Sequence, residues 1–162
     1  RPEVDLRIRY GFGAWPDETA TLLMNEAIFP IASPKFAERH ADSTTADIPS
    51  LPLLHVDWVD AEWTTWDELL RRAAIPHRPI FGRRFSTFGV MLQACQDDQG
   101  LALGWQRLVG GLIAAGKVVP FTDLRVPSPG CYYVTWNTNR GPSTAISTLR
   151  DWLLEAATVQ SM

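Results

Sequence analysis

The alternation of strand-like and helix-like segments constrains this chain most, and it is clearest between residues 80 and 121. IFGRRF (80–85) is strand-like, and apolar residues at helical spacing follow until Gly100. LALGW (101–105) predicts a short buried strand, with a helix near residues 106–115 and a further strand in KVVPF (117–121). This alternation predicts an α/β fold with a mostly parallel sheet and helices on both faces.

The segments before residue 40 continue this pattern. Residues 4–10 alternate between apolar and polar side chains until Gly11, which predicts a strand and a sharp exit. TLLMNEAIFPIAS (21–33) is a long apolar strand in which Pro30 lacks a backbone donor, so we expect a bend, a bulge or a sheet edge there. A short helix is expected from Pro34.

Three further elements are expected. LLHV (53–56) is a short strand, and a helix introduced near Asp60 carries Trp63 and Trp66 on its packed apolar face. CYYVTWN is a strand, and a last amphipathic helix opening at 141–142 needs a sheet to cover its apolar stripe.

Charge and hydropathy limit the classes of function. The chain has 162 residues, 46% of them hydrophobic, a net charge of -3 and no run of Lys or Arg. We therefore expect a folded protein with no footprint for nucleic acid or an anionic membrane, so any contact with DNA needs another segment. It contains no stretch of roughly 18 to 20 apolar residues and no signal-peptide core, so we expect a cytoplasmic location.

The cysteines and histidines predict no special chemistry. Cys95 and Cys131 lie in apolar runs without Cys-x-x-Cys spacing, which indicates small core residues in a reducing compartment. His40, His55 and His77 are scattered, so we expect neither a zinc site nor any cofactor.

Ligands of α/β sheets collect at the carboxyl ends of strands, where helix N-termini offer unpaired N–H groups to an anion. The best candidates by this rule follow the strands at 80–85 and 101–105: Ser86, Thr87, Phe88, Gly104, Trp105 and Gln106.

Several segments together resemble one family. VDLRIRYGFGAWP resembles the strand-and-turn signature of the effector-binding (substrate-binding) domain of LysR-type transcriptional regulators, above all the subgroup of the glycine-cleavage activator. LLMNEAIFPIASP is similar to that family's crossing strand, LPLLHVDW to its entry into the second lobe, and STFGVMLQACQDDQGLALGWQRLV to the stretch lining its effector cleft. CYYVTWN and RDWLLEAA complete a resemblance that covers nearly the whole chain in order.

The resemblance implies a bilobal, periplasmic-binding-protein-like (type 2) α/β fold with mixed sheets and helices on both faces. The family's domain begins with two more strands and helices, preceded by a winged helix-turn-helix, so we expect an incomplete first lobe. Residues 1–33 and 138–162 would form the remainder of the first lobe with the crossing strands, and residues 34–137 the second lobe. Arg7 departs from the family's pattern, in which this buried-strand position is small or apolar.

The resemblance also implies a sensor rather than an enzyme. A small-molecule effector would bind between the lobes and change how a homo-oligomer, a dimer or a tetramer, holds DNA through a winged helix-turn-helix outside this chain, with no membrane partner. The helix N-terminus and Arg9, rather than the resemblance, suggest an amino acid or another small carboxylate as the effector. The cleft residues carried over are Arg9, Tyr10, Gly11, Ser86, Thr87, Phe88, Gly104 and Trp105.

Simpler roles stay open for these residues. Ser86 and Thr87 can merely cap a helix, Phe88 can be a core residue, and Arg9 can be a solvated charge at a strand end. We also expect association through the first lobe, or disorder of residues 1–13, because missing strands would expose apolar surface.

Two other functions are alternatives. A periplasmic solute-binding protein has the same bilobal architecture, although the DLRIRYG signature and the absence of a signal peptide count against it. An enzyme would need Cys95 or Cys131 as a nucleophile with His55 or His77 as its base, without a recognisable nucleophile turn.

Overall fold

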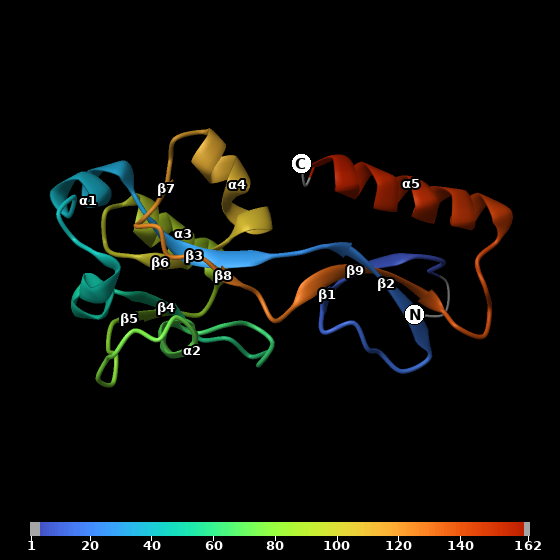
Figure 1. Cartoon of the computed structure of the whole chain (residues 1–162), viewed down its shortest axis with the longest axis horizontal. Helices are drawn as coiled ribbons and strands as arrows, with labels where there is room; N and C mark the ends of the chain where they lie inside the picture. The colour runs from blue at the N-terminus through green and yellow to red at the C-terminus, as the bar shows by residue number, and fades with distance from the viewer. Residues whose placement is uncertain (1–3, 161–162) are drawn as a thin grey trace. The chain divides into compact units, whose positions relative to one another are not determined.

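The computed structural model describes residues 4–160, and within them the chain forms two compact units (Figure 1). Of the described residues, unit 1 combines 4–26 with 128–160, and unit 2 comprises 27–127. The sequence-based division had placed residues 27–33 in the first lobe and 128–137 in the second. Strand pairing explains the difference, because 27–32 pairs inside unit 2 and 131–137 pairs inside unit 1.

Unit 1 is an antiparallel three-stranded sheet with one long helix. Its strands are β1 (Arg7–Gly11), β2 (Glu18–Met24) and β9 (Cys131–Asn137), in the order β1-β9-β2. Helix α5 (Thr144–Gln160) follows. It begins two residues later than predicted because the Ser143 hydroxyl accepts a hydrogen bond from the Ile146 amide at 3.3 Å, as an N-cap does.

Unit 2 alternates strands and helices along the chain. Its elements are β3 (Ala27–Ala32), α1 (Pro34–Arg39), the 3-10 helix η1 (Thr45–Ser50), β4 (Leu54–Val56), α2 (Trp66–Arg72), β5 (Arg83–Phe85), α3 (Phe88–Gln96), β6 (Ala102–Trp105), α4 (Gln106–Ala114), β7 (Val119–Pro120) and β8 (Val126–Pro127).

The sheet of unit 2 is mixed, so the expectation of a mostly parallel sheet was wrong. β3 is central and runs antiparallel to β6, β7 and β8. Parallel pairing among the described residues is confined to β4 with β5 and to one bridge between Leu53 and Leu101. β3 begins the unit and β8 ends it, and β8 pairs antiparallel with the start of β3. The chain therefore enters and leaves the unit at neighbouring strands.

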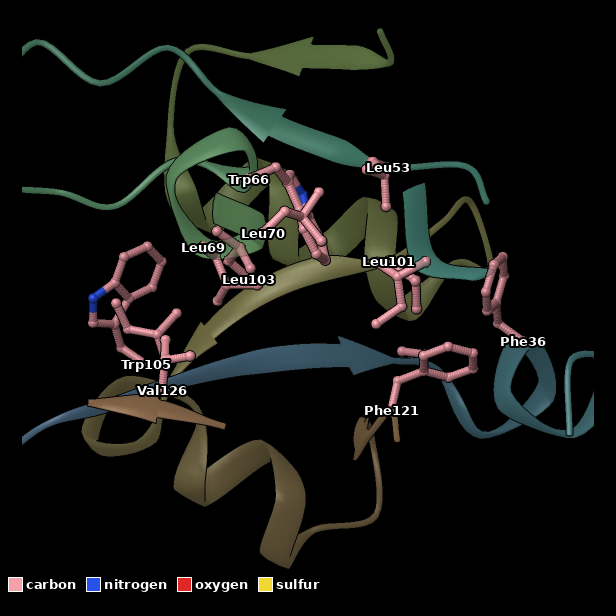
Figure 2. Packing of buried hydrophobic residues seen from close by; sticks show 13 residues of the cluster. Phe36, Leu53, Trp66, Leu69, Leu70, Leu101, Leu103, Trp105, Phe121 and Val126 are labelled. Carbon is pink, nitrogen blue, oxygen red and sulfur yellow. The ribbon is translucent and has the colours of Figure 1, made fainter. Parts of the chain in front are cut away.

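Helices cover both faces of this sheet, as predicted. Ile28 on β3 and Leu103 on β6 pack with Trp66 and its neighbours on α2 (Figure 2). The alternate residues Phe29 and Ala102 belong to a second cluster with α3 and α4. Successive strand residues point to opposite faces, so each strand serves two cores.

Pro30 lies in the middle of the central strand, neither at an edge nor at a bend. Its carbonyl accepts a hydrogen bond from Phe121 at 2.8 Å. On that side of β3, β8 pairs with Ala27 and Ile28, whereas β7 pairs with Ile31 and Ala32. The missing donor of Pro30 therefore falls between two short partner strands, where no ladder needs it. The break in the predicted 21–33 strand comes earlier, between β2 and β3.

Helix α2 begins at Trp66, later than predicted. The Thr65 hydroxyl accepts a hydrogen bond from the Glu68 amide at 3.3 Å and caps the helix, and Asp67 and Glu68 occupy its first turn. Trp63 consequently lies in the irregular segment before α2 rather than on its apolar face.

Candidate functional site

Unit 2 contains a cavity of about 180 Å³ between β4 and β6. The two strands are joined where the Leu54 amide bonds to the Leu101 carbonyl at 2.8 Å. Beyond that point β4 pairs with β5 and β6 pairs with β3, and residues of both strands, including Val56 and Leu103, line the cavity. A cavity of benzene-binding size is of the order of 150 Å³, so this one can hold a small organic molecule.

Three tryptophans line this cavity, Trp58, Trp66 and Trp105. Trp105, at the end of β6, is 1% exposed and packs edge-to-face against Trp58, Trp63 and Phe88, with ring centroids 5.7, 5.3 and 5.8 Å away. Trp58 and Trp63 stack on each other at 5.0 Å. Trp66 lies over β6 beside Leu103 (Figure 2), and its indole N–H donates to the Leu54 carbonyl at 2.8 Å.

Three of the residues that line this cavity each carry a buried polar atom with no hydrogen-bond partner among the described residues. These atoms are Nε2 of His55, Oγ1 of Thr64 and Nε1 of Trp105. Buried polar groups are nearly always paired, and an unpaired one costs roughly 1–3 kcal/mol. Their concentration at one cavity therefore points to a binding function.

The surroundings of His55 favour its neutral form. Burial lowers the pKa of His55, the charge of Arg84 lowers it further, and Asp57 opposes the shift only in part. The imidazole is therefore neutral at pH 7. Arg84 lines the cavity and bonds to Asp57 at 2.6 Å, and Asp67 on another side bonds to His77 at 2.8 Å.

The predicted residues around α3 lie near the cavity without lining it. Ser86 is exposed. The Thr87 hydroxyl accepts from the Val90 amide at 3.4 Å and caps α3, as the simpler interpretation allowed. Phe88 is half-buried and packs against Trp58 and Trp105, but it does not itself line the cavity.

The two predicted residues of β6 also differ. Trp105 lines the cavity. Gly104 faces the opposite core, where an added Cβ would stand 2.9 Å from Cγ2 of Ile31 and 3.1 Å from Cγ2 of Val109. Glycine at position 104 thus permits close packing of β6.

Arg9, Tyr10 and Gly11 lie on β1 in unit 1. Arg9 bonds to Glu18 at 2.7 Å and stacks over the Trp15 ring at 4.6 Å. Tyr10 and the Ser128 hydroxyl share a hydrogen bond of 2.7 Å. Gly11 is buried and pairs with Cys131 on β9.

Arg7 is half-buried and paired. Its guanidinium donates to Glu18 at 2.6 Å, so Arg7 and Arg9 hold one carboxylate from the same face of β1. Burial alone would raise the pKa of Glu18, but the hydrogen bond from Arg9 and the charges of both arginines outweigh it, so this pKa is lowered. A cavity of about 340 Å³ adjoins the pair, with Asp5, Asp17 and Arg140 also in its lining.

The thiols do not support nucleophilic chemistry at Cys95. Burial raises the pKa of Cys95 to about 12, and its Sγ lies 3.7 Å from the Ile31 carbonyl. A thiol this buried stays protonated and inert. Cys131 belongs to unit 1, whereas His55 and His77 belong to unit 2. The described residues contain no group of three potential metal ligands.

Comparison with known proteins identifies the family. The model of the LysR substrate binding domain matches residues 1–158. This chain belongs to that family. Its sequence is 30% identical over 161 residues to the glycine cleavage system transcriptional activator of Escherichia coli K12, covering 98% of the chain and 51% of the relative. It is 29% identical over 153 residues to the transcriptional activator AmpR of Rhodobacter capsulatus, covering 94% of the chain and 50% of AmpR.

Solved LysR effector domains share the fold. The effector domain of AmpR from Pseudomonas aeruginosa aligns with a TM-score of 0.76 at 28% identity, over 97% of this chain and 74% of that one. The effector-binding domain of AmpR from Citrobacter freundii gives 0.75 at 27% identity, over 96% and 75%. The predicted periplasmic-binding-protein-like fold and the LysR resemblance are confirmed, and the chain is an effector-binding regulatory domain of this family.

The chain spans about half the length of the curated relatives it matches. Those relatives are transcriptional activators, and the alternative of a periplasmic solute-binding protein receives no support from them. Helices in residues 4–160 lack the length and apolar character needed to cross a membrane.

Sequence reasoning missed most of the cavity. His55, Trp58, Thr64 and Arg84 line it but lie outside the predicted strand ends. No local pattern marks them. They meet only around the space where β4 and β6 diverge. Only Trp105 was predicted as a site residue and lines the cavity.

Proposed function

We propose that this domain is the sensing part of a cytoplasmic LysR-type regulator and that the cavity between β4 and β6 receives its small-molecule effector. In the whole protein, a homo-oligomer would hold DNA through a separate winged helix-turn-helix. Binding would change DNA affinity without catalysis, because an effector that prefers one arrangement of the protein shifts the population toward it.

The cavity is the observation that carries this proposal. It combines aliphatic and aromatic walls with a few unpaired polar atoms, the usual character of small-molecule sites. Arg9, Tyr10 and Gly11 remain proposed effector contacts, and the association of the protein through the first lobe remains a prediction. Of the segment expected to be disordered, residues 1–3 lie outside the described residues.

A thermal-shift screen tests the proposal. Anionic, neutral and cationic small molecules are added to the domain and to a Val56→Phe variant, in which a larger side chain enters the cavity. A ligand at about 100 times its Kd stabilises the folded state by about 2.7 kcal/mol, or roughly 5–10 °C in Tm. We expect at least one such shift in the wild-type domain and its loss in the variant.

The matched control is Val90→Phe, because Val90 is 57% exposed on α3 and does not line the cavity. This variant should respond like the wild type. A ligand whose shift survives in Val56→Phe would contradict the assignment of the cavity, and silence across the whole screen would contradict the sensing function of this domain.

A further inference from the structure

The unpaired atoms at the cavity define the polar part of a ligand. Nε1 of Trp105 is a donor only, so it needs an acceptor. The Thr64 hydroxyl and the neutral His55 imidazole can each donate or accept. A single acceptor group with two oxygens could satisfy several of them at once.

The charges around the cavity favour a negative group. Arg84 lines the cavity, and its influence on the pKa of His55 exceeds that of Asp57, which favours an anion there. Asp67, the acidic residue in the lining, is bonded to Arg71 at 3.0 Å as well as to His77, which offsets its charge. A cationic ligand would meet the Arg84 guanidinium and an unmatched indole N–H.

The rest of the lining is apolar and of limited volume. Val56, Ile80, Met91 and Leu103 supply aliphatic contacts beside the indole rings. At about 180 Å³, the cavity fits a body of roughly one six-membered ring.

We infer that the ligand of this cavity is a small monocarboxylate with a compact apolar body, its carboxylate held by Trp105 Nε1 and the Thr64 hydroxyl beside His55. The inference rests on the proposed sensing function and specifies its ligand class and its specificity-determining residues.

Contact between a ligand and these buried atoms requires a movement of residues 57–65. The unpaired atoms are closed off from solvent, and Trp58 and Trp63 of this segment cover Trp105. The segment has no helix or strand and is tied by the ion pair of Asp57 with Arg84 at 2.6 Å. Binding therefore changes the conformation of this segment as well as filling the cavity.

Three ring compounds of matched size test the charge preference: benzoate, neutral benzamide and cationic benzylamine. Each is titrated at pH 7 while the indole N–H resonances are followed by NMR, with Trp105→Phe to assign that signal. Charge-assisted hydrogen bonds are about twice as strong as neutral ones, so benzoate should bind at least roughly fivefold tighter than benzamide. Benzylamine should bind weakest, and the Trp105 signal should shift saturably with benzoate.

Thr64→Val separates ligand binding from folding. It removes an unpaired hydroxyl at nearly constant shape, so Tm should stay the same or rise, whereas benzoate affinity should fall about tenfold. Thr148→Val on α5 is the control, because Thr148 is exposed in unit 1 and should leave benzoate binding unchanged. Bound benzoate, unlike benzamide, should also raise the pKa of His55.

Stronger binding of benzamide or benzylamine than of benzoate would overturn the carboxylate assignment while leaving the sensing function intact. Unchanged benzoate affinity in Thr64→Val would overturn the role of Thr64. If none of the three compounds binds, the inferred class is wrong, and the proposed function fails only if the broad thermal-shift screen is silent too.

Discussion

The two units of this domain are stabilised in different ways. Unit 2 buries apolar side chains on both faces of its sheet and still keeps a cavity with unpaired polar atoms. Unit 1 has a three-stranded sheet in which Arg7 and Arg9 hold Glu18, and it leaves Ile8, Leu22 and Trp152 exposed by 57%, 46% and 60%.

This difference indicates where stability and recognition lie. The apolar packing of unit 2 stabilises it enough to offset the free-energy cost of the unpaired polar atoms in its binding site. Unit 1 buries fewer apolar side chains and pairs the mostly buried Glu18 carboxylate with two arginines, so its stability should fall when acid protonates Glu18.

The largest expected effect is the loss of folding stability when a buried tryptophan is truncated. Trp66→Ala removes a 2% exposed indole from the core of unit 2 and should cost about 3–5 kcal/mol. Trp152→Ala, on the exposed face of α5, should change stability by less than about 0.5 kcal/mol. Denaturant unfolding measures both, and similar losses would refute the contrast between the units.

The two cysteines, one in each unit, should react with a thiol reagent at very different rates. A pKa of about 12 leaves about one Cys95 thiolate in ten thousand at pH 8, so Cys95 should react with a thiol reagent only when the protein unfolds. Half-buried Cys131 should react in the folded protein, and a Cys131→Ser variant should keep only the slow phase. Rapid labelling of Cys95 in the folded Cys131→Ser protein would show that the core of unit 2 opens readily.

The charge pairs of unit 1 predict its acid sensitivity. Because the pKa of Glu18 is lowered in the folded state, its stabilisation is complete above the ordinary Glu value of about 4.3 and is lost as pH falls through the lower folded value. Glu18→Gln should cost about 1 kcal/mol at pH 7 and less at pH 3. Asp151→Asn, which removes an exposed partner of Arg150, should have little effect at either pH. A pH-independent cost of Glu18→Gln would mean that packing, not charge, is lost.

The smallest expected effect is a difference in folding stability between valine variants of two adjacent threonines in unit 2. Thr64→Val should change stability by less than about 0.5 kcal/mol or increase it, since Thr64 has an unpaired hydroxyl. Thr65→Val should cost about 1 kcal/mol because it removes the cap of α2. Thermal unfolding compares them, and an equal cost would show that the Thr64 hydroxyl has a partner in the folded protein.

Much of the fold was predictable from local patterns. The Thr87 cap, the β6 strand and the short α1 helix were placed correctly, because each is determined by residues next to each other in sequence. Strand direction was not predictable, because the reversal of β3 depends on pairing with residues about 75 and 90 positions away. The position of Pro30 likewise makes sense only once the gap between β7 and β8 is known.

The site was less predictable than the fold. Trp105 followed from the rule that ligands gather at strand ends, and it lines the cavity. His55 and Thr64 gave no signal, because their importance comes from lacking hydrogen-bond partners, which only three-dimensional packing reveals. Gly104 was predicted as a contact by the same rule, yet it faces the other core of the sheet.

Amide hydrogen exchange, measured with and without the compound that raises Tm most in the thermal-shift screen, tests the central claim most directly. The claim is that unit 2 contains the effector cavity. Binding should slow exchange in residues 54–66 and 103–106, and additional protection at 7–11 would fit the predicted contribution of Arg9, Tyr10 and Gly11. Protection confined to unit 1, or none in residues 54–66 despite a raised Tm, would contradict the account.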